Sequence, residues 1–223
     1  CGDLGGENIR DLLDQTAFEH LAVRVDASDL RTRRTLTTAG FFPADSILTY
    51  LYYPEDGGIP DPPPSRSTSR YTFRPYEPAD RDSILRITSQ SYARYPGRYH
   101  TDPWLQELSA ERYLRWAEKC VDGEADQICV SEANGRIVGY VAFRYDRRLY
   151  RVLGIGCYGG GLGASRGGDY LRLLRYTLMC DKAIPWHFAE CDTQIDNYLV
   201  HRIYHALKLD YVRAEYTYHL HRR

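Results

Sequence analysis

Two polar side chains near the C-terminal end of the sequence are spaced so that they can act together. Asn197 follows the stretch 193–196, which is typical of a strand end and a turn, and Tyr204 comes seven residues later. If a helix begins at Asn197, the two residues lie two turns apart and share one face. An amide and a phenol are then presented together where a strand meets a helix, which favours an enzyme over a domain without catalytic function. The structural alternatives are a helix N-cap for Asn197 and a core tyrosine for Tyr204.

A glycine-rich segment is the second candidate for chemistry. Residues 150–156 are predicted to form a strand, and residues 159–168 a glycine-rich loop that leads into a helix. Bare backbone N–H groups and a helix N-terminus can together bind an anion such as a pyrophosphate, and Arg166 can pair with phosphate oxygens. A surface loop or lid that binds no ligand is the alternative.

The same region also matches the sequence motif of a dinucleotide-binding site. Gly154, Gly156 and Gly159 fit G-x-G-x-x-G, and Asp181 follows about twenty residues on. That pattern needs a helix to open at the third glycine and the acidic residue to end the next strand. Here more glycines follow Gly159, and Asp181 comes after a predicted helix, so a dinucleotide site is disfavoured.

The charge and hydropathy of the chain exclude several classes of function. The 223 residues carry a net charge of −1 with no long run of one sign, which argues against a nucleic-acid partner, because such proteins usually show a basic excess. No apolar run approaches the roughly 18 residues of a membrane span. No signal peptide is visible, but the chain begins at Cys1, so we expect that a segment upstream of it is missing.

The cysteines predict neither a metal site nor a disulfide framework. They form no C-x-x-C pair and no cluster with histidines, so we expect no metal. They are typical of small core residues in a reducing compartment, which predicts a cytoplasmic protein. The six residues are Cys1, Cys120, Cys129, Cys157, Cys180 and Cys191.

The clearest boundary in the chain is the stretch 54–70, which is rich in Pro, Gly and Ser and typical of a linker. It separates a small N-terminal part, 1–53, from a larger part, 71–223. The N-terminal part is marginal in size, so we expect it to dock on the larger part or to extend its sheet. Its predicted strand, helix and strand span residues 21–25, 28–38 and 46–53.

The larger part alternates between strand and helix patterns. The predicted order is β-α-α-β-β-β-α-β-α-β, with a hairpin turn at Asn134-Gly135. This order predicts an α/β (α+β) fold with a mixed, largely antiparallel central sheet flanked by helices. The elements are expected at 71–74, 78–92, 109–123, 127–132, 137–143, 150–156, 169–180, 187–193, 197–207 and 212–220.

The order of elements resembles that of the GNAT N-acetyltransferase superfamily. The stretch 71–80, Tyr-Thr-Phe-Arg-Pro-Tyr-Glu-Pro-Ala-Asp, is similar to the opening strand and helix start of that superfamily, and the spacing of Asn197 and Tyr204 is similar to its closing helix. The resemblance implies a GNAT fold, acetyl-CoA as the donor and an amine as the acceptor.

The resemblance also implies roles for individual residues. Tyr204 would protonate the sulfur of CoA as general acid, and Asn197 would hydrogen-bond the pantetheine arm. A backbone N–H in the stretch Ile155, Gly156 and Cys157 would hold the carbonyl oxygen of the thioester.

The superfamily binds the diphosphate of CoA on a loop of the form (Arg/Gln)-x-x-Gly-x-(Gly/Ala). Arg166, Gly167 and Gly168 match the start of this loop, whereas Asp169 and Leu171 replace its later small residues.

A narrower resemblance within the superfamily is to the TDP-fucosamine acetyltransferases, which N-acetylate an amino-dideoxysugar carried on TDP. It implies a nucleotide-linked amino sugar as the acceptor, bound by Arg98, Tyr99, His100 and Trp104 from a loop between two helices. A structured surface loop without a ligand is the alternative for these residues. The similar stretches are 98–104, 112–116, 127–130 and 139–144.

Several alternatives stay open at this point. The general base could be His100, His187 or His201, which are candidates by residue type only, or a water relay. The acceptor could be a protein, a peptide, an antibiotic or another small-molecule amine, and the acyl group could be longer than acetyl. A binding module that kept the fold but lost the donor site, and a homodimer, are also compatible with the sequence.

Overall fold

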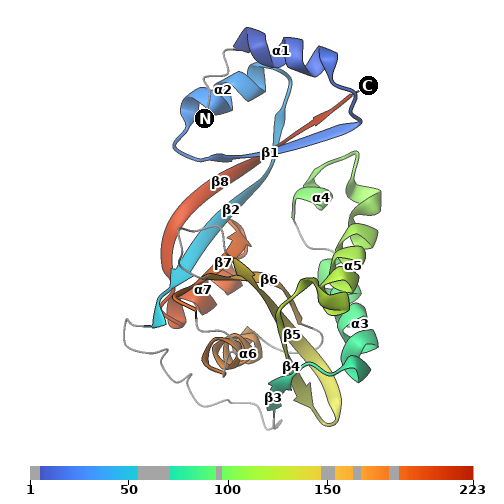
Figure 1. Cartoon of the computed structure of the whole chain (residues 1–223), viewed down its shortest axis with the longest axis vertical. Coiled ribbons are helices and arrows are strands. Elements are labelled where there is room, and N and C mark those ends of the chain that lie inside the picture. The colour runs from blue at the N-terminus through green and yellow to red at the C-terminus, as the bar shows by residue number, and fades with distance from the viewer. Residues whose placement is uncertain are drawn as a thin grey trace.

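The structure is a computed structural model that describes residues 6–54, 71–93, 97–146, 154–162, 167–180 and 186–222. These residues form one eight-stranded sheet in the order β1-β8-β2-β7-β6-β5-β4-β3, flanked by helices (Figure 1). The strands are β1 (His20–Asp26), β2 (Phe42–Tyr52), β3 (Tyr71–Pro75), β4 (Gln127–Ala133), β5 (Arg136–Asp146), β6 (Gly154–Leu162), β7 (Phe188–Gln194) and β8 (Asp210–His221). Neighbouring strands are antiparallel except β6 and β7, which are parallel. The predicted mixed, largely antiparallel sheet is confirmed.

The helices lie in the positions that cover the sheet. The α-helices are α1 (Gly6–Gln15), α2 (Leu30–Thr38), α3 (Arg81–Tyr92), α4 (Arg98–Thr101), α5 (Ser109–Lys119), α6 (Gly167–Met179) and α7 (Tyr198–Ala206). Three further helical segments of the described residues are η2 (Pro78–Asp80), η3 (Gln106–Leu108) and η4 (Cys120–Glu124). Among the described residues, no helix combines the length and the apolar character needed to cross a membrane.

Alternating side chains on β4 and β5 place two helix pairs on opposite faces of the sheet. Val130 and Tyr140 belong to the core cluster that includes residues of α3, whereas Cys129 and Val141 belong to the cluster that includes residues of α6 and α7. Successive strand residues point to opposite faces. It follows that α3 covers one face, with α5 packed beside it, and that α6 and α7 cover the other.

The N-terminal strands belong to the same sheet as the rest of the chain. Both β1 and β2 pair with β8, and β2 also pairs with β7. The helix between them begins at an N-cap, where the carboxylate of Asp29 accepts a hydrogen bond from the N–H of Thr32 at 2.9 Å. It is followed by Gly40, whose φ of +96° suits glycine. The stretch 55–70 lies outside the described residues, so the linker there stays a prediction.

The larger part follows the predicted order of elements, including the hairpin. Asn134 and Gly135 have φ values of 52° and 70°, the signature of a two-residue turn between β4 and β5. The predicted helix over 109–123 is divided at its end, because the backbone changes to the wider turn η4 at Cys120.

The glycine-rich segment corrects the sequence-based prediction. The expected loop begins at Gly159, but β6 continues to Leu162, so Gly160 and Gly161 are strand residues. A Cβ at Gly161 would lie 2.9 Å from Cε1 of Tyr140 and 3.0 Å from Cγ2 of Ile87. Glycine is therefore used here for close packing, not for a loop. Residues 150–153 and 163–166 lie outside the described residues.

The neighbouring strands β6 and β7 separate partway along their length. They pair only at three positions, Gly154 with Phe188, Ile155 with Ala189 and Gly156 with Glu190. Beyond this point β6 stays paired with β5, and β7 stays paired with β2. The sheet therefore divides after Gly156 and Glu190 within the described residues.

Candidate active site

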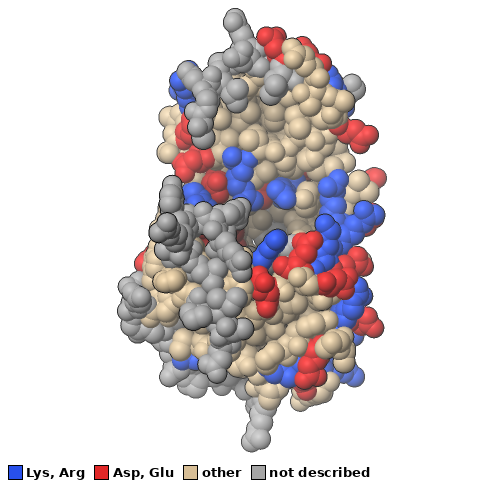
Figure 2. All heavy atoms as spheres, viewed as in Figure 1, with Lys and Arg blue, Asp and Glu red and all other residues tan. Residues whose placement is uncertain are grey.

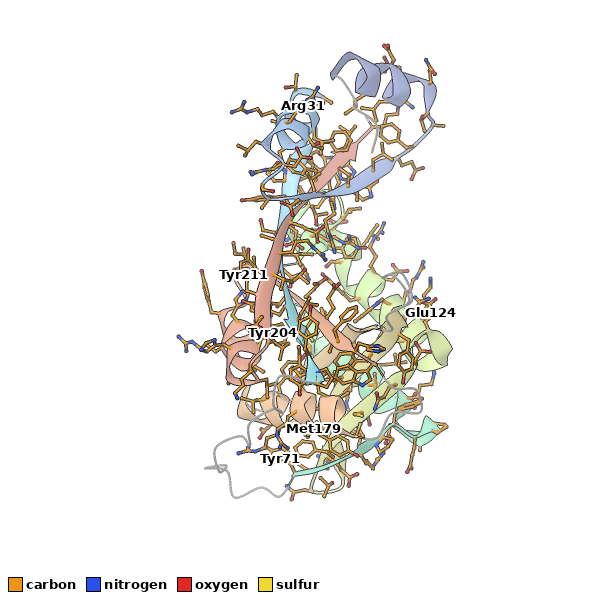
Figure 3. All side chains as sticks on the ribbon, turned by 60° about the vertical axis from the view of Figure 1, so that its left-hand side comes forward. Arg31, Tyr71, Glu124, Met179, Tyr204 and Tyr211 are labelled. Atoms are coloured by element: carbon orange, nitrogen blue, oxygen red, sulfur yellow. The ribbon has the colours of Figure 1, made fainter. Side chains whose placement is uncertain are left out.

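Tyr204 lies where β6 and β7 separate. Its ring is buried, with 2% of the residue exposed, and packs edge-on against Tyr50. Its hydroxyl donates a hydrogen bond to the backbone carbonyl oxygen of Asp192 at 3.2 Å, and Asp192 is two residues beyond the last β7 residue that pairs with β6. In Figure 3, Tyr204 lies between α7 and the sheet. The side chain is thus a core residue whose polar tip is directed at the end of β7.

Asn197 is the N-cap of α7. Its Oδ1 accepts a hydrogen bond from the N–H of Val200 at 3.5 Å, and its Nδ2 donates to Oγ1 of Thr193 at 2.9 Å. The capping alternative is therefore present in the structure, and it joins the end of β7 to the start of the helix that carries Tyr204. A contact with pantetheine stays a prediction.

The backbone of β6 is irregular at the residues predicted to hold the thioester. Ile155 and Gly156 pair with β7, whereas Cys157 comes just after that pairing ends. On the other side of β6 the register with β5 shifts, since Phe143 pairs with Cys157 but Ala142 pairs with Gly159. An extra residue on one strand bends it and re-aims its backbone groups, so this stretch is suited to presenting an N–H toward the opening.

The predicted diphosphate loop is described only in part. Arg166 lies outside the described residues, while Gly167 and Gly168 form the first turn of α6. Asp169 in the same turn is 3% exposed, and its carboxylate lies 3.8 Å from the guanidinium of Arg172. Its negative charge opposes a diphosphate there, and Arg172 offsets part of that charge.

A pocket of about 320 Å³ opens between the sheet and the helices α3, α4 and α5. Its lining combines aromatic rings and guanidinium groups around one carboxylate and one amide. The lining residues are Arg24, Asp45, Ile47, Tyr92, Arg98, Tyr99, Arg112, Tyr113, Trp116 and Gln194. Gln194 is two residues beyond Asp192, so the pocket reaches the end of β7. Figure 2 shows a hollow at mid-height on the face in view, with Lys and Arg side chains around it.

Only two of the four residues predicted to bind the acceptor line this pocket. Arg98 and Tyr99 do so from α4, a short helix where a loop is expected, and the guanidinium of Arg98 donates to the hydroxyl of Tyr99 at 2.9 Å. His100 instead places Nε2 2.8 Å from the carbonyl oxygen of Tyr92. Trp104 is half-exposed and stacks on His221, with 4.8 Å between ring centroids.

A second, larger pocket adjoins the first. It measures about 550 Å³ and shares Tyr99, Arg112 and Trp116 with it. Arg115 and Lys119 also line it, but each is paired with a glutamate of the same lining, Glu111 and Glu124 respectively. The two pockets therefore share a wall made of two aromatic rings and one guanidinium group.

Asp45 is a site residue that sequence reasoning missed. Burial raises the pKa of its carboxyl above the ordinary 3.8, while the hydrogen bond from Gln194, at 3.4 Å, acts in the opposite direction. Burial, and then the charge of Asp45, raise the pKa of Tyr113 in the same pocket. A partly buried carboxylate with a raised pKa in a cleft is suited to accept a proton. The sequence signal was a charged residue directly before the strand predicted at 46–53. In the structure β2 begins earlier and includes Asp45.

Of the three histidines considered as bases, His100 and His201 have other partners. The two ring nitrogens of His201 lie 2.9 Å from the hydroxyl of Tyr50 and 3.1 Å from the carbonyl oxygen of Ile195. His187 is exposed just before β7. Neither His201, His187 nor His100 is among the described residues that line the 320 Å³ pocket.

Comparison with known proteins identifies the fold. No family model matches the chain, and no curated protein sequence matches it. The chain is similar to a GCN5-related N-acetyltransferase from Sphaerobacter thermophilus, with a TM-score of 0.62 and 17% identity over 96% of this chain, although it spans only 64% of that protein. It is also similar to a GCN5-related N-acetyltransferase from Kribbella flavida, with a TM-score of 0.61 and 12% identity over 96% of this chain and 76% of that one.

A third similar structure has a more specific description. It is the GCN5-related glucosamine N-acetyltransferase region of a fungal multi-domain GH3 beta-N-acetylglucosaminidase, with a TM-score of 0.61, 12% identity, and coverage of 88% of this chain and 24% of that one. The chain therefore has the fold of the GCN5-related N-acetyltransferases, and the predicted GNAT fold is confirmed.

Proposed function

We propose that the protein is an N-acetyltransferase that moves the acetyl group of acetyl-CoA to an amine. The observation that carries this proposal is the hydroxyl of Tyr204 at the place where β6 and β7 part, bonded to Asp192, which is two residues before Gln194 of the pocket that holds the raised-pKa carboxylate of Asp45. For acetyl-CoA bound between the parted strands, backbone N–H groups of β6 suit one side and the phenol of Tyr204 suits the other. A fold shared with GCN5-related N-acetyltransferases supports the same reading.

The donor would lie between the parted strands. Ile155, Gly156 and Cys157 supply the irregular backbone whose N–H groups suit a thioester carbonyl oxygen. Asn197 at the adjoining helix end suits the pantetheine arm, and Tyr204 suits the departing sulfur as proton donor. Arg166, Gly167 and Gly168 would hold the diphosphate at the start of α6.

The acceptor amine must be neutral when it attacks, so a proton has to leave it. Asp45 is the group in the 320 Å³ pocket that is suited to take that proton, directly or through a water. The raised pKa makes its carboxylate a better base than an exposed one, because proton affinity rises with pKa. The proton that Tyr204 gives to the sulfur and the proton that Asp45 takes balance over one turnover.

We further propose a nucleotide-linked amino sugar, such as a TDP-amino-deoxysugar, as the acceptor. Arg24, Arg98 and Arg112 line the pocket around a single carboxylate, a charge balance that suits a diphosphate. Tyr99 and Trp116, shared by both pockets, suit stacking on a base or a sugar ring. The glucosamine N-acetyltransferase region with this fold supports an amino sugar as the class.

Calorimetry with acetyl-CoA and a panel of amines test this proposal. We expect acetyl-CoA to bind and TDP- or UDP-linked amino sugars to gain the mass of one acetyl group, faster than the same amino sugars without nucleotide. Acetylation of peptides or free amines alone would favour a different acceptor class. Absence of acetyl-CoA binding at millimolar concentration would overturn the enzyme and favour a binding module, which the buried Asp169 at the start of α6 also suits.

A further inference from the structure

Three histidines and one aspartate converge at the end of the sheet away from Tyr204. His20, Asp102, His219 and His221 each offer one ligand atom, and these four atoms lie within 4.8 Å of one another. Neither the proposed acetyl transfer nor the pockets described above use this group.

The sheet register brings the histidines together. His20 on β1 pairs directly with His221 on β8. His219 is two residues before His221, so all three side chains point to the same face. The ring of His20 lies edge-on to that of His219 and is stacked on that of His221, with centroids 4.6 Å and 4.7 Å apart.

Asp102 enters the group from the end of α4. It is fully buried, and its Oδ2 lies 2.6 Å from Nδ1 of His219 and 2.7 Å from Nε2 of His221. Its other oxygen accepts a hydrogen bond from the backbone N–H of Trp104 at 2.9 Å. One carboxylate is thereby held against two imidazoles without contact with bulk solvent.

Two ring nitrogens in this group are left without a partner. Nε2 of His219, a residue that is fully buried, and Nε2 of His20 are both buried and accept or donate no hydrogen bond. A buried polar atom without a partner is costly and calls for an explanation, of which an ion is one.

We propose that His20, Asp102, His219 and His221 form a binding site for one Zn²⁺ ion. Three imidazoles and one carboxylate are a ligand set that Zn²⁺ accepts, and four protein ligands close its tetrahedral shell. Ligand atoms around tetrahedral zinc lie roughly 3.3 Å apart, a value between the 2.7 Å that separates Oδ2 of Asp102 from Nε2 of His221 and the 4.8 Å that bounds the group. Arg98 and Arg112 place positive charge near His219 and His20 respectively, and the carboxylate of Asp102 offsets their charge toward the ion.

A closed shell assigns this ion a structural role. It would join β1, β8 and the end of α4, and α4 carries Arg98 and Tyr99 into the 320 Å³ pocket. The ion would thus hold one wall of the pocket on the sheet. The site departs from the expectation that the chain binds no metal.

Zinc binding to the chelator-treated protein tests the proposal. We expect one equivalent of Zn²⁺ to bind, by calorimetry and by elemental analysis after desalting, and to raise Tm by roughly 5–10 °C at about 100 times Kd. His20→Phe keeps a ring in the cluster but removes a ligand atom. It should weaken binding at least about 100-fold, because loss of a mere outer-shell partner already costs about 10–100-fold.

The controls separate a specific site from general histidine binding. His205→Gln removes an exposed histidine of α7 and should bind Zn²⁺ as the unaltered protein does. Asp102→Asn keeps the shape of the carboxylate and should also lose tight binding; circular dichroism establishes that each variant is folded. If Zn²⁺ fails to bind, or if folded His20→Phe binds it as tightly as the unaltered protein, the site is overturned and the cluster is a metal-free hydrogen-bonded link.

Discussion

The hydroxyl of Tyr204 and the backbone carbonyl oxygen of Asp192 lie 3.2 Å apart, and this hydrogen bond connects α7 to the part of β7 that no longer pairs with β6. The phenol donates in this bond, which orients its hydroxyl toward the region where β6 no longer pairs with β7. The carbonyl oxygen of Asp192 therefore positions a hydroxyl group at the place where the two strands separate.

Tyr204→Phe should lower kcat by about 100-fold or more, because general acid catalysis contributes about 10²–10⁴-fold. Affinity for acetyl-CoA should change little, since the ring stays in place. Turnover by mass spectrometry and donor binding by calorimetry measure the two effects. Tyr198→Phe is the matched control, because that tyrosine is on the same helix and 71% exposed, and it should leave both unchanged. An unaltered rate in Tyr204→Phe would remove Tyr204 from the acid role.

Asp45→Asn should lower kcat/KM and change its pH dependence. In the unaltered enzyme the rate should fall as the pH drops through the raised pKa of Asp45, because only the carboxylate accepts a proton. In Asp45→Asn this acid limb should be absent from the residual activity. pH–rate profiles over the acidic range provide the measurement, and an identical acid limb in both proteins would assign the base elsewhere.

Asp45→Asn should lower activity but raise the free energy of unfolding at neutral pH. The pKa of Asp45 is higher in the folded protein than the ordinary 3.8, so ionisation of this carboxyl disfavours folding. The unfavourable contribution is complete above the folded-state pKa and vanishes below the unfolded-state pKa. Asp45→Asn should therefore be the more stable protein near pH 7 and lose this advantage as the pH falls, as urea unfolding at several pH values would reveal.

Arg98→Gln should raise KM for a nucleotide-linked acceptor by about tenfold or more, with a smaller effect on kcat, because a hydrogen bond between charged groups contributes about 1.5–3 kcal/mol. KM for acetyl-CoA should stay the same. Arg31→Gln removes an exposed arginine on α2 (labelled in Figure 3) and serves as the charge control. Equal KM values for Arg98→Gln and the control would argue against phosphate recognition by this residue.

Gly161→Ala should destabilise the fold by about 1–3 kcal/mol, the usual cost of overpacking a core. The added Cβ would be 2.9 Å from Tyr140 and 3.0 Å from Ile87. Gly156→Ala in the same strand is the control, since the atom nearest its Cβ is the carbonyl oxygen of Arg144 at 3.9 Å. Denaturant midpoints compare the two. Equal stability would show that α3 can move away from β6 without cost.

The features that could be predicted from the sequence are those that neighbouring residues determine. Asp29 caps its helix through a residue three positions on, and Asn134-Gly135 defines a hairpin by its own backbone preferences. The order of strands and helices follows from similar local patterns. The glycines at 160 and 161 were misassigned to a loop, because their need for close packing comes from Tyr140 and from α3, which are distant in sequence.

The candidate site was predictable only where one element carries it. Asn197 and Tyr204 are on one helix end, so their spacing was visible. Asp45 was not, because its raised pKa depends on burial beneath helices that follow much later in the chain. The histidine cluster was hidden for the same reason, as His20 meets its partners only through the pairing of β1 with β8.

That pairing also bears on how the chain folds. The strands β1 and β2 follow each other in sequence but are not neighbours in the sheet, because β8 lies between them. The edges of β1 and β2 therefore stay unpaired until β8, the last strand in the sequence, can insert between them. Such long-range closure slows folding and leaves strand edges exposed to other chains in the meantime. We therefore expect the edges of β1 and β2 to stay open to pairing with other chains until β8 has been synthesised.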